Sequence, residues 1–270
     1  MEIKDREAII LEIINLALKA GEEILKIYNT DFEVKTKEDL SPLTQADLIS
    51  NSIINEGLQQ TGIPIISEEN KKIPYEKRKD WQIFWLVDPL DGTKEFVERI
   101  GQFTVNIALI RNRLPEIGVI YAPYMHLLYF GDISMGAYRI RNPRKEYKNF
   151  QDIAREVVQM PEIQNSPTIG VVASRSHYNE ETKKFVEKLK VQHPDLELLN
   201  IGSSLKFGLL AEGRAHFYPR FAPTYEWDIA AGHAIIRSIG GTVMDYETKG
   251  ELLYNKPSLI NAWFLAYMLN

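Results

Sequence analysis

The chain has 270 residues, of which 44% are hydrophobic and 26% charged, and its formal net charge is −5. This length and balance predict one large globular unit, or two packed halves, with a substantial core. The negative charge argues against a binder of polymeric nucleic acid, which needs a basic face. It leaves room for an anionic small molecule, because bound cations can reverse the local field. The sequence contains no cysteine, which excludes disulfides and thiolate chemistry.

Both ends of the chain bear on its location. The N-terminal sequence MEIKDREAII carries charges where a signal peptide needs an apolar core, so we do not expect secretion. The run AWFLAYML, residues 262–269, is too short to span a bilayer. We expect it to be a buried segment and leave peripheral membrane contact open. The protein is therefore expected in the cytoplasm, and its sequence does not indicate an oligomeric state.

The first half of the chain predicts two helices and then a series of strands. Apolar residues recur at helical spacing over residues 5–29, and a second helix is expected from Gln45 to about Gln60, capped by Thr44. Strands are expected at residues 63–67, 83–87, 103–110, 116–123 and 126–132. The polar stretch 141–152 suggests a division into an N-terminal half, 1–145, and a C-terminal half, 146–270.

The second half of the chain alternates between strands and helices. Strands are expected at residues 168–174, 196–200, 215–220 and 242–246. Helices are expected at residues 179–190, 203–213 and 227–241. Strands that alternate with helices predict α/β layers.

Two aspartates follow a buried strand in the stretch IFWLVDPLDGTKEF, residues 83–96. Taken alone, this pattern indicates a tight turn and nothing more. The same turn would bring the carboxylates of Asp88 and Asp91 and the carbonyl of Leu90 toward one point. Such oxygens are the ligands that Mg²⁺ prefers. Next to them, Gly92 permits close approach of a ligand, and a helix that begins near Thr93 would offer its free N–H groups to a phosphate.

Other acidic residues have ordinary explanations when they are taken singly. Glu68 and Glu69 follow a short strand and could lie in a solvated turn; since neighbours on a strand face opposite sides, we choose Glu68 as the metal ligand. Asp228 at the start of an Ala-rich helix resembles an N-cap. Asp47 resembles a first-turn helix acid. Their combination with the aspartate pair favours a metal site.

The ordered segments EE, WLVDPLDGT and WDIAAG resemble the lithium-sensitive, Mg²⁺-dependent phosphatases typified by inositol monophosphatase. Finer features, namely DPLDGTKEF, VVASRSH, IGSSLKFGLLAEG and YPRFAPTYEWD, are similar to the 3′(2′),5′-bisphosphate nucleotidases of the CysQ type. The resemblance covers nearly the whole chain. It implies an α/β (α+β layered) fold, an α-β-α-β-α sandwich of the inositol monophosphatase and sugar phosphatase type.

The resemblance also implies two or three Mg²⁺ ions and a set of site residues. The positions that match the metal ligands are Glu68, Asp88, the Leu90 carbonyl, Asp91 and Asp228. The positions that match residues orienting the attacking water are Glu68, Thr93 and Asp47. The positions expected to contact the substrate are Gly92, Thr93, Ser176, His177, Ser203, Lys206, Arg220 and Asp228.

A bisphosphate has a second phosphate, and Lys206 and Arg220 are the cations expected to bind it. Ser176, His177 and Ser203 would meet the ribose, a phosphate or the base. Each of these residues also has a plainer interpretation. Ser203 could cap a helix, Lys206 could be a surface charge, and His177 taken alone would be a solvated loop histidine.

The implied reaction is hydrolysis of the 3′-phosphate of adenosine 3′,5′-bisphosphate to AMP, and of the same phosphate in its 5′-sulfated form. An inositol or broad sugar phosphatase is the alternative. The inositol branch carries a glutamate about seven residues before the WD aspartate, where this chain has Phe221. A non-catalytic metal or nucleotide binder is a third hypothesis, disfavoured by the water-orienting Thr93. HExxH and P-loop motifs are missing, so the sequence supports neither zinc chemistry nor use of a nucleoside triphosphate.

Overall fold

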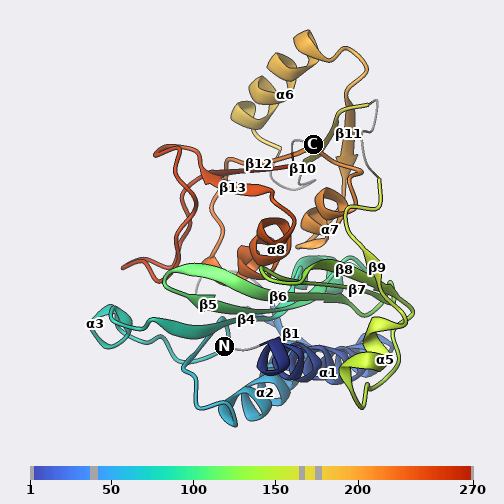
Figure 1. The fold of residues 1–270 in the computed structure, drawn as a ribbon, viewed down its shortest axis with the longest axis vertical. Coiled ribbons are helices and arrows are strands. Elements are labelled where there is room, and N and C mark those ends of the chain that lie inside the picture. The colour runs from blue at the N-terminus through green and yellow to red at the C-terminus, as the bar shows by residue number, and fades with distance from the viewer. Residues whose placement is uncertain (1–2, 37–41, 164–167, 174–177, 269–270) are drawn as a thin grey trace.

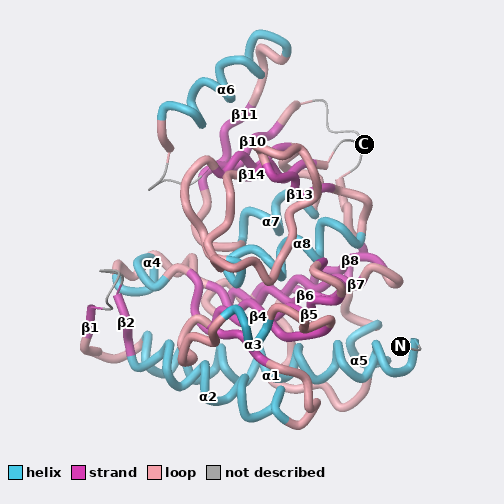
Figure 2. Tube along the Cα trace, turned by 90° about the vertical axis from the view of Figure 1, so that its left-hand side faces the viewer, coloured by secondary structure: helices cyan, strands magenta, loops and turns pink. Residues whose placement is uncertain are grey.

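The computed structural model describes residues 3–36, 42–163, 168–173 and 178–268. Helices and sheets alternate in five layers (Figure 1). The outer layer holds α1 (Ile3–Tyr28) and α2 (Gln45–Gln59), both close to their expected bounds. Figure 2 shows these two helices along one side of the larger sheet. The expected α-β-α-β-α sandwich is therefore confirmed.

The second layer is a sheet of seven strands in the order β3-β4-β5-β6-β7-β8-β9. The pair β3 and β4 is parallel, and the other neighbours are antiparallel. The strands are β3 (Ile65–Ser67), β4 (Ile83–Asp91), β5 (Thr104–Arg111), β6 (Leu114–Ala122), β7 (Leu127–Asp132), β8 (Gly136–Arg141) and β9 (Val158–Gln159). The sequence did not predict β8 and β9, because charged residues interrupt the apolar pattern there. The division near residue 145 stays a prediction, although β9 lies beyond it and pairs with β8.

The fourth layer is a sheet of five strands in the order β11-β10-β12-β14-β13. Its strands are β10 (Gly170–Ala173), β11 (Glu197–Asn200), β12 (Phe217–Arg220), β13 (Thr242–Asp245) and β14 (Phe264–Tyr267). The last apolar run of the sequence forms β14, an inner strand that pairs antiparallel with both β12 and β13. This position confirms the expected buried segment.

Helices α7 (Leu205–Ala211) and α8 (Glu226–Ser238) lie between the two sheets, and α6 (Glu180–Gln192) packs on the far side of the smaller sheet. The remaining elements are the short strands β1 (Val34–Thr36) and β2 (Pro42–Thr44) and the short helices α3 (Tyr75–Arg78), α4 (Thr93–Val97) and α5 (Phe150–Ala154). No helix of the described segments is long and apolar enough to cross a membrane.

Helix α8 fits closely against the larger sheet because small residues meet at the contact. Ala231 and Ala234 are buried on the helix, and Gly118 faces them from β6. A Cβ atom built on Gly118 would lie 2.4 Å from the carbonyl oxygen of Ala231. This packing fixes the height of α8 above the sheet, and α8 carries one of the expected metal ligands.

Candidate active site

The aspartate pair lies at an irregular end of β4. The strand continues past the expected end at residue 87, and its register against β5 shifts between Asp88 and Asp91. Asp88 is buried, and its Oδ1 accepts a hydrogen bond of 3.1 Å from the backbone N–H of Leu90. The expected turn is thus an irregularity within a strand, and Asp88, the Leu90 carbonyl and Asp91 lie together at the end of β4.

A short hydrogen-bonded chain connects Thr93 to the start of α2. Oγ1 of Thr93 lies 3.1 Å from Oδ1 of Asp47 and 3.2 Å from the carbonyl oxygen of Leu90. Oδ2 of Asp47 accepts hydrogen bonds of 2.7 Å from the backbone N–H and from the hydroxyl of Thr44. Asp47 is therefore both the capping-box acid of α2 and a neighbour of Thr93. The structure brings together Thr93 and Asp47, two of the three residues that the resemblance assigned to the attacking water.

Asp91 is held by the loop that precedes α7. Its Oδ2 accepts hydrogen bonds of 2.6 Å from the hydroxyl of Ser203 and from the backbone N–H of Ser204. The Ser204 hydroxyl continues this network, 2.7 Å from Oδ1 of Asn106 and 2.7 Å from the hydroxyl of Thr104. Sequence reasoning missed Thr104 and Asn106 as part of the site. The signal was present on β5, where Thr104 and Asn106 are two apart and so share one face of the strand.

Asp228 lies in the first turn of α8, three residues beyond the N-cap. The N-cap is Tyr225, whose backbone N–H donates a hydrogen bond of 2.9 Å to Oδ2 of Asp228. Interpreting Asp228 as an N-cap is therefore wrong, since α8 begins two residues earlier. Burial raises the pKa of Asp228 well above its usual value, and the charges of Asp91 and Glu68 raise it further. Three acids from distant segments thus share one region.

The donor types in this region fit a hard divalent cation. Carboxylates and a peptide carbonyl are oxygen ligands, and a cation would offset the repulsion that raises the pKa of Asp228. Among the described residues, however, no group of three or more His, Asp or Glu side chains is arranged so that it could hold a metal ion. The raised pKa of Asp228 is compatible with this spacing of the acids. Charges affect a pKa over longer distances than the metal–oxygen bonds of about 2.0–2.6 Å that a metal site needs. The acids therefore lie in one region but not around one common position. Asp91 instead accepts hydrogen bonds from Ser203 and Ser204.

A cavity of about 290 Å³ lies beside the acids. Five of the expected substrate residues line it: Gly92, Ser203, Lys206, Arg220 and Asp228. Gly92 has a φ of 87°, a left-handed conformation that favours glycine, and a Cβ atom there would lie 3.0 Å from the carbonyl oxygen of Gln102. The backbone can therefore approach a ligand closely at this position.

Lys206 is buried in this cavity, so its interpretation as a surface charge is wrong. Its Nζ donates a hydrogen bond of 2.8 Å to the carbonyl oxygen of Ser203 and lies 5.6 Å from the centre of the Tyr218 ring. Burial lowers the pKa of Lys206 to about 8, although the charge of Asp91 acts in the opposite direction. Ser203 has a φ of 55° and precedes the N-cap Ser204, so it does not cap α7.

Three other positions complete the comparison with the sequence. Ser176 and His177 lie outside the described residues. Phe221 is buried, with its ring centre 4.4 Å from that of Tyr246 and 5.8 Å from that of Trp263. An aromatic cluster thus occupies the position where the inositol branch carries its glutamate.

Two sheets with helices between and outside them, and an acidic cluster at the end of β4, define the class of inositol monophosphatase-like phosphatases. The chain belongs to the inositol monophosphatase family, whose model matches residues 5–267. The family resemblance drawn from the motifs is therefore confirmed.

Three proteins with the name CysQ are similar to this chain over nearly its whole length. The 3′(2′),5′-bisphosphate nucleotidase CysQ of Buchnera aphidicola is 43% identical over 265 residues, which cover 96% of this chain and 93% of that protein. The protein of the same name from Escherichia coli K12 is 39% identical over 257 residues, covering 94% and 97%. The crystal structure of CysQ from Bacteroides thetaiotaomicron matches with a TM-score of 0.88 and 43% identity over 97% of each chain.

Proposed function

We propose that this protein is a 3′(2′),5′-bisphosphate nucleotidase that hydrolyses the 3′-phosphate of adenosine 3′,5′-bisphosphate to AMP and phosphate. Relatives with this activity in their name are 39–43% identical over nearly the whole chain. The observation that carries the proposal is one cavity whose lining includes the acids Asp91 and Asp228 and the bases Lys206 and Arg220. Acids suit metal ions at the reacting phosphate, and bases suit a second phosphate.

The residues that would hold two or three Mg²⁺ ions are Glu68, Asp88, the Leu90 carbonyl, Asp91 and Asp228. Bound Mg²⁺ neutralises the phosphate oxygens and lowers the pKa of a coordinated water. Of these residues, Asp91 and Asp228 line the cavity. No protein nucleophile is required for this reaction.

Thr93 and Asp47 would orient the attacking water together with Glu68. When the hydroxyl of Thr93 donates to Asp47, its oxygen keeps lone pairs that can accept a hydrogen bond from the water. Asp47 is fixed by the start of α2, which in turn fixes the Thr93 hydroxyl. Gly92 and the N–H of Thr93 would receive the reacting phosphate.

Lys206 and Arg220 would bind the second phosphate, with Ser203 and Asp228 beside the ribose. Burial strengthens an ion pair between Lys206 and a phosphate, because little water screens it. Ser176 and His177 are further proposed contacts for the nucleotide. The 5′-sulfated nucleotide carries the same 3′-phosphate, and we propose it as a second substrate. The same resemblance supports a cytoplasmic location.

The alternative function is an inositol or broad sugar phosphatase. Phe221 disfavours this alternative, because its buried phenyl ring cannot accept hydrogen bonds from the hydroxyl groups of an inositol ring as a glutamate would. The test compares Mg²⁺-dependent phosphate release from adenosine 3′,5′-bisphosphate, inositol 1-phosphate and fructose 1,6-bisphosphate. Preference for the nucleotide supports the proposal, and preference for inositol 1-phosphate overturns the substrate while leaving the acidic site intact. If the protein with Mg²⁺ releases phosphate from none of the three compounds, the result supports a non-catalytic binder.

Substituting Asp88→Asn should abolish turnover and leave the protein folded. The amide keeps the shape of the side chain but loses the charge that a metal ion needs. Phosphate release and thermal unfolding should be measured together, with the exposed Asp80→Asn as the control. Turnover near that of the unsubstituted protein would contradict the assignment of Asp88 to the metal site.

A further inference from the structure

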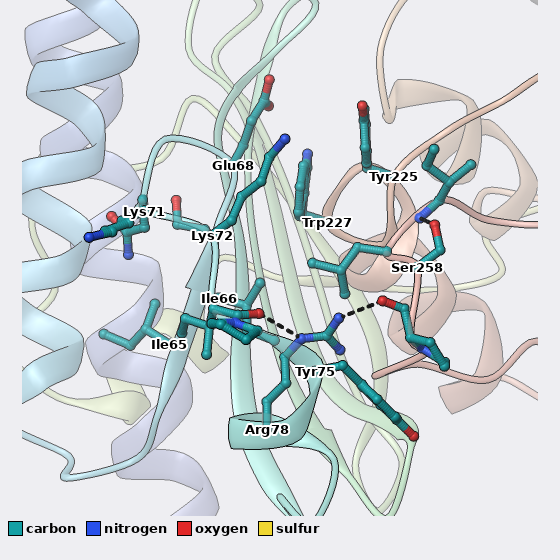
Figure 3. Close-up of a pocket in the computed structure, with 17 residues that line it drawn as sticks. Ile65, Ile66, Glu68, Lys71, Lys72, Tyr75, Arg78, Tyr225, Trp227 and Ser258 are labelled. Atoms are coloured by element: carbon teal, nitrogen blue, oxygen red, sulfur yellow. Dashed lines mark hydrogen bonds between the residues drawn. The ribbon is translucent and has the colours of Figure 1, made fainter. Parts of the chain in front are cut away.

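A second pocket lies apart from the cavity beside Asp91, and Glu68 is the only residue of its described lining to which the proposed reaction gives a role. Its volume is about 540 Å³, larger than the cavity beside Asp91. It lies between the segment from β3 to α3 and the segments around Trp227 and residues 257–260 (Figure 3). The two cavities share no lining residue of the described chain. A volume of this size suits a small organic molecule.

The charge of this pocket is positive. Of the described residues that line it, Lys71, Lys72 and Arg78 are basic, and Glu68 is acidic. Arg78 is 2% exposed, and its guanidinium donates hydrogen bonds to neutral oxygens of residues 73 and 255–257. The nearby carboxylate of Glu226 forms an ion pair of 2.6 Å with Lys256. The positive charge of the buried Arg78 therefore acts on the pocket and favours an anionic ligand there.

The pocket also contains a buried donor without a hydrogen-bond partner. Trp227 is 7% exposed, and its indole N–H makes no hydrogen bond. In Figure 3, the indole nitrogen of Trp227 and the ammonium group of Lys72 point toward the same end of the pocket. A buried donor costs free energy when it lacks an acceptor. An acceptor group on a bound ligand would remove this cost.

Part of the pocket lining is aromatic or aliphatic. The rings of Tyr225 and Trp227 are stacked at 4.7 Å with an angle of 9° between them. Ile66, Ile73 and Leu259 are among the aliphatic residues of the lining. A planar ring would match these walls, since aromatic groups bury much surface and stack in offset arrangements.

We propose that this pocket binds a planar aromatic anion at a second site, separate from the site of the nucleotide phosphates. The aromatic ring lies against the apolar walls, and the anionic group lies at the end where the Trp227 N–H and Lys72 point. Among the described lining residues, Arg78 and the two lysines carry three positive charges against the single negative charge of Glu68.

The test uses 2-naphthoate as the probe and isothermal titration of the full chain without Mg²⁺. We expect one molecule of 2-naphthoate to bind, and the neutral 2-naphthamide to bind at least tenfold more weakly. Trp227→Phe keeps a ring but removes the N–H, so it should weaken 2-naphthoate about tenfold or more. The control is Trp263→Phe, a partly exposed tryptophan outside the pocket, which should change nothing.

A second variant guards against misfolding of Trp227→Phe. Ile260 lines the pocket and is 48% exposed, so Ile260→Glu should fold and repel the anion. Val191→Glu, on exposed α6, is its control. Absence of binding, equal binding by both tryptophan variants, or displacement of 2-naphthoate by AMP or inorganic phosphate would each overturn the proposal. Because the titration involves no turnover, none of these results bears on the nucleotidase activity.

Discussion

Asp91, which we propose as a metal ligand, is held by side chains of β5 and of the loop before α7. The Ser204 hydroxyl joins Asn106 and Thr104, and the Ser204 N–H holds Asp91. All of these side chains except that of Asp91 are buried. The network therefore fixes the orientation of the Asp91 carboxylate before any metal arrives.

Substituting Ser204→Ala should raise the Mg²⁺ concentration needed for half-maximal activity and lower kcat about tenfold. The change leaves Oδ1 of the buried Asn106 without this donor, which costs about 1–3 kcal/mol and loosens the loop that holds Asp91. Phosphate release should be measured over a series of Mg²⁺ concentrations. Ser52→Ala, on the exposed side of α2, is the control, and an unchanged Mg²⁺ requirement in Ser204→Ala would contradict a positioning role.

Lys206, which we propose as a contact of the second phosphate, should make substrate binding depend on pH. Its pKa is lowered to about 8 by burial, so the ammonium group loses its proton as the pH rises through 8. The KM for adenosine 3′,5′-bisphosphate should therefore rise above pH 8, by roughly tenfold or more for a lost charged hydrogen bond. The KM for adenosine 3′-monophosphate, which lacks the second phosphate, should not rise above pH 8.

Lys206→Arg is the matched variant, because a guanidinium keeps its charge at these pH values. Its KM for the bisphosphate should lose the rise above pH 8. If both proteins show the same pH profile, Lys206 does not bind the second phosphate.

At the scale of elements, α8 joins the two sheets and carries Asp228 at its first turn. Gly118→Ala should destabilise the protein by about 1–3 kcal/mol through overpacking. The added methyl would meet backbone atoms of Ala231 at 2.4 Å and 2.9 Å, and backbone cannot rotate away. Turnover should fall as well, since α8 must shift and Asp228 with it.

Urea unfolding and phosphate release check this prediction together. Gly250→Ala is the control, because the nearest atom to its added Cβ lies 3.7 Å away. Equal stability of the two variants would show that the contact between β6 and α8 adapts easily.

At the scale of the molecule, the layer of α7 and α8 is shared by both sheets. Removing either sheet would expose one face of this layer, so we expect the protein to unfold in one cooperative transition. Scanning calorimetry should give one peak whose calorimetric and van't Hoff enthalpies agree. Two separated peaks would instead support independent halves divided near residue 145.

The sequence by itself determined the five longer helices, most of the strands and the identity of the acidic residues, but it did not predict the short helices α3 and α5. Helical and alternating apolar patterns are local, so α1, α2 and α8 were predictable from their spacing. The ordered motifs around Glu68, Asp88 and Asp228 were likewise visible along the chain and indicated the family.

Only the tertiary structure decided which of these residues meet and what surrounds them. The bond between Asp91 and the Ser204 N–H joins positions 113 residues apart. The burial of Lys206 and the lone N–H of Trp227 depend on how α7 and α8 fit between two sheets. Long-range contacts follow from packing rather than from local preference, and they set the environment that gives each side chain its chemistry.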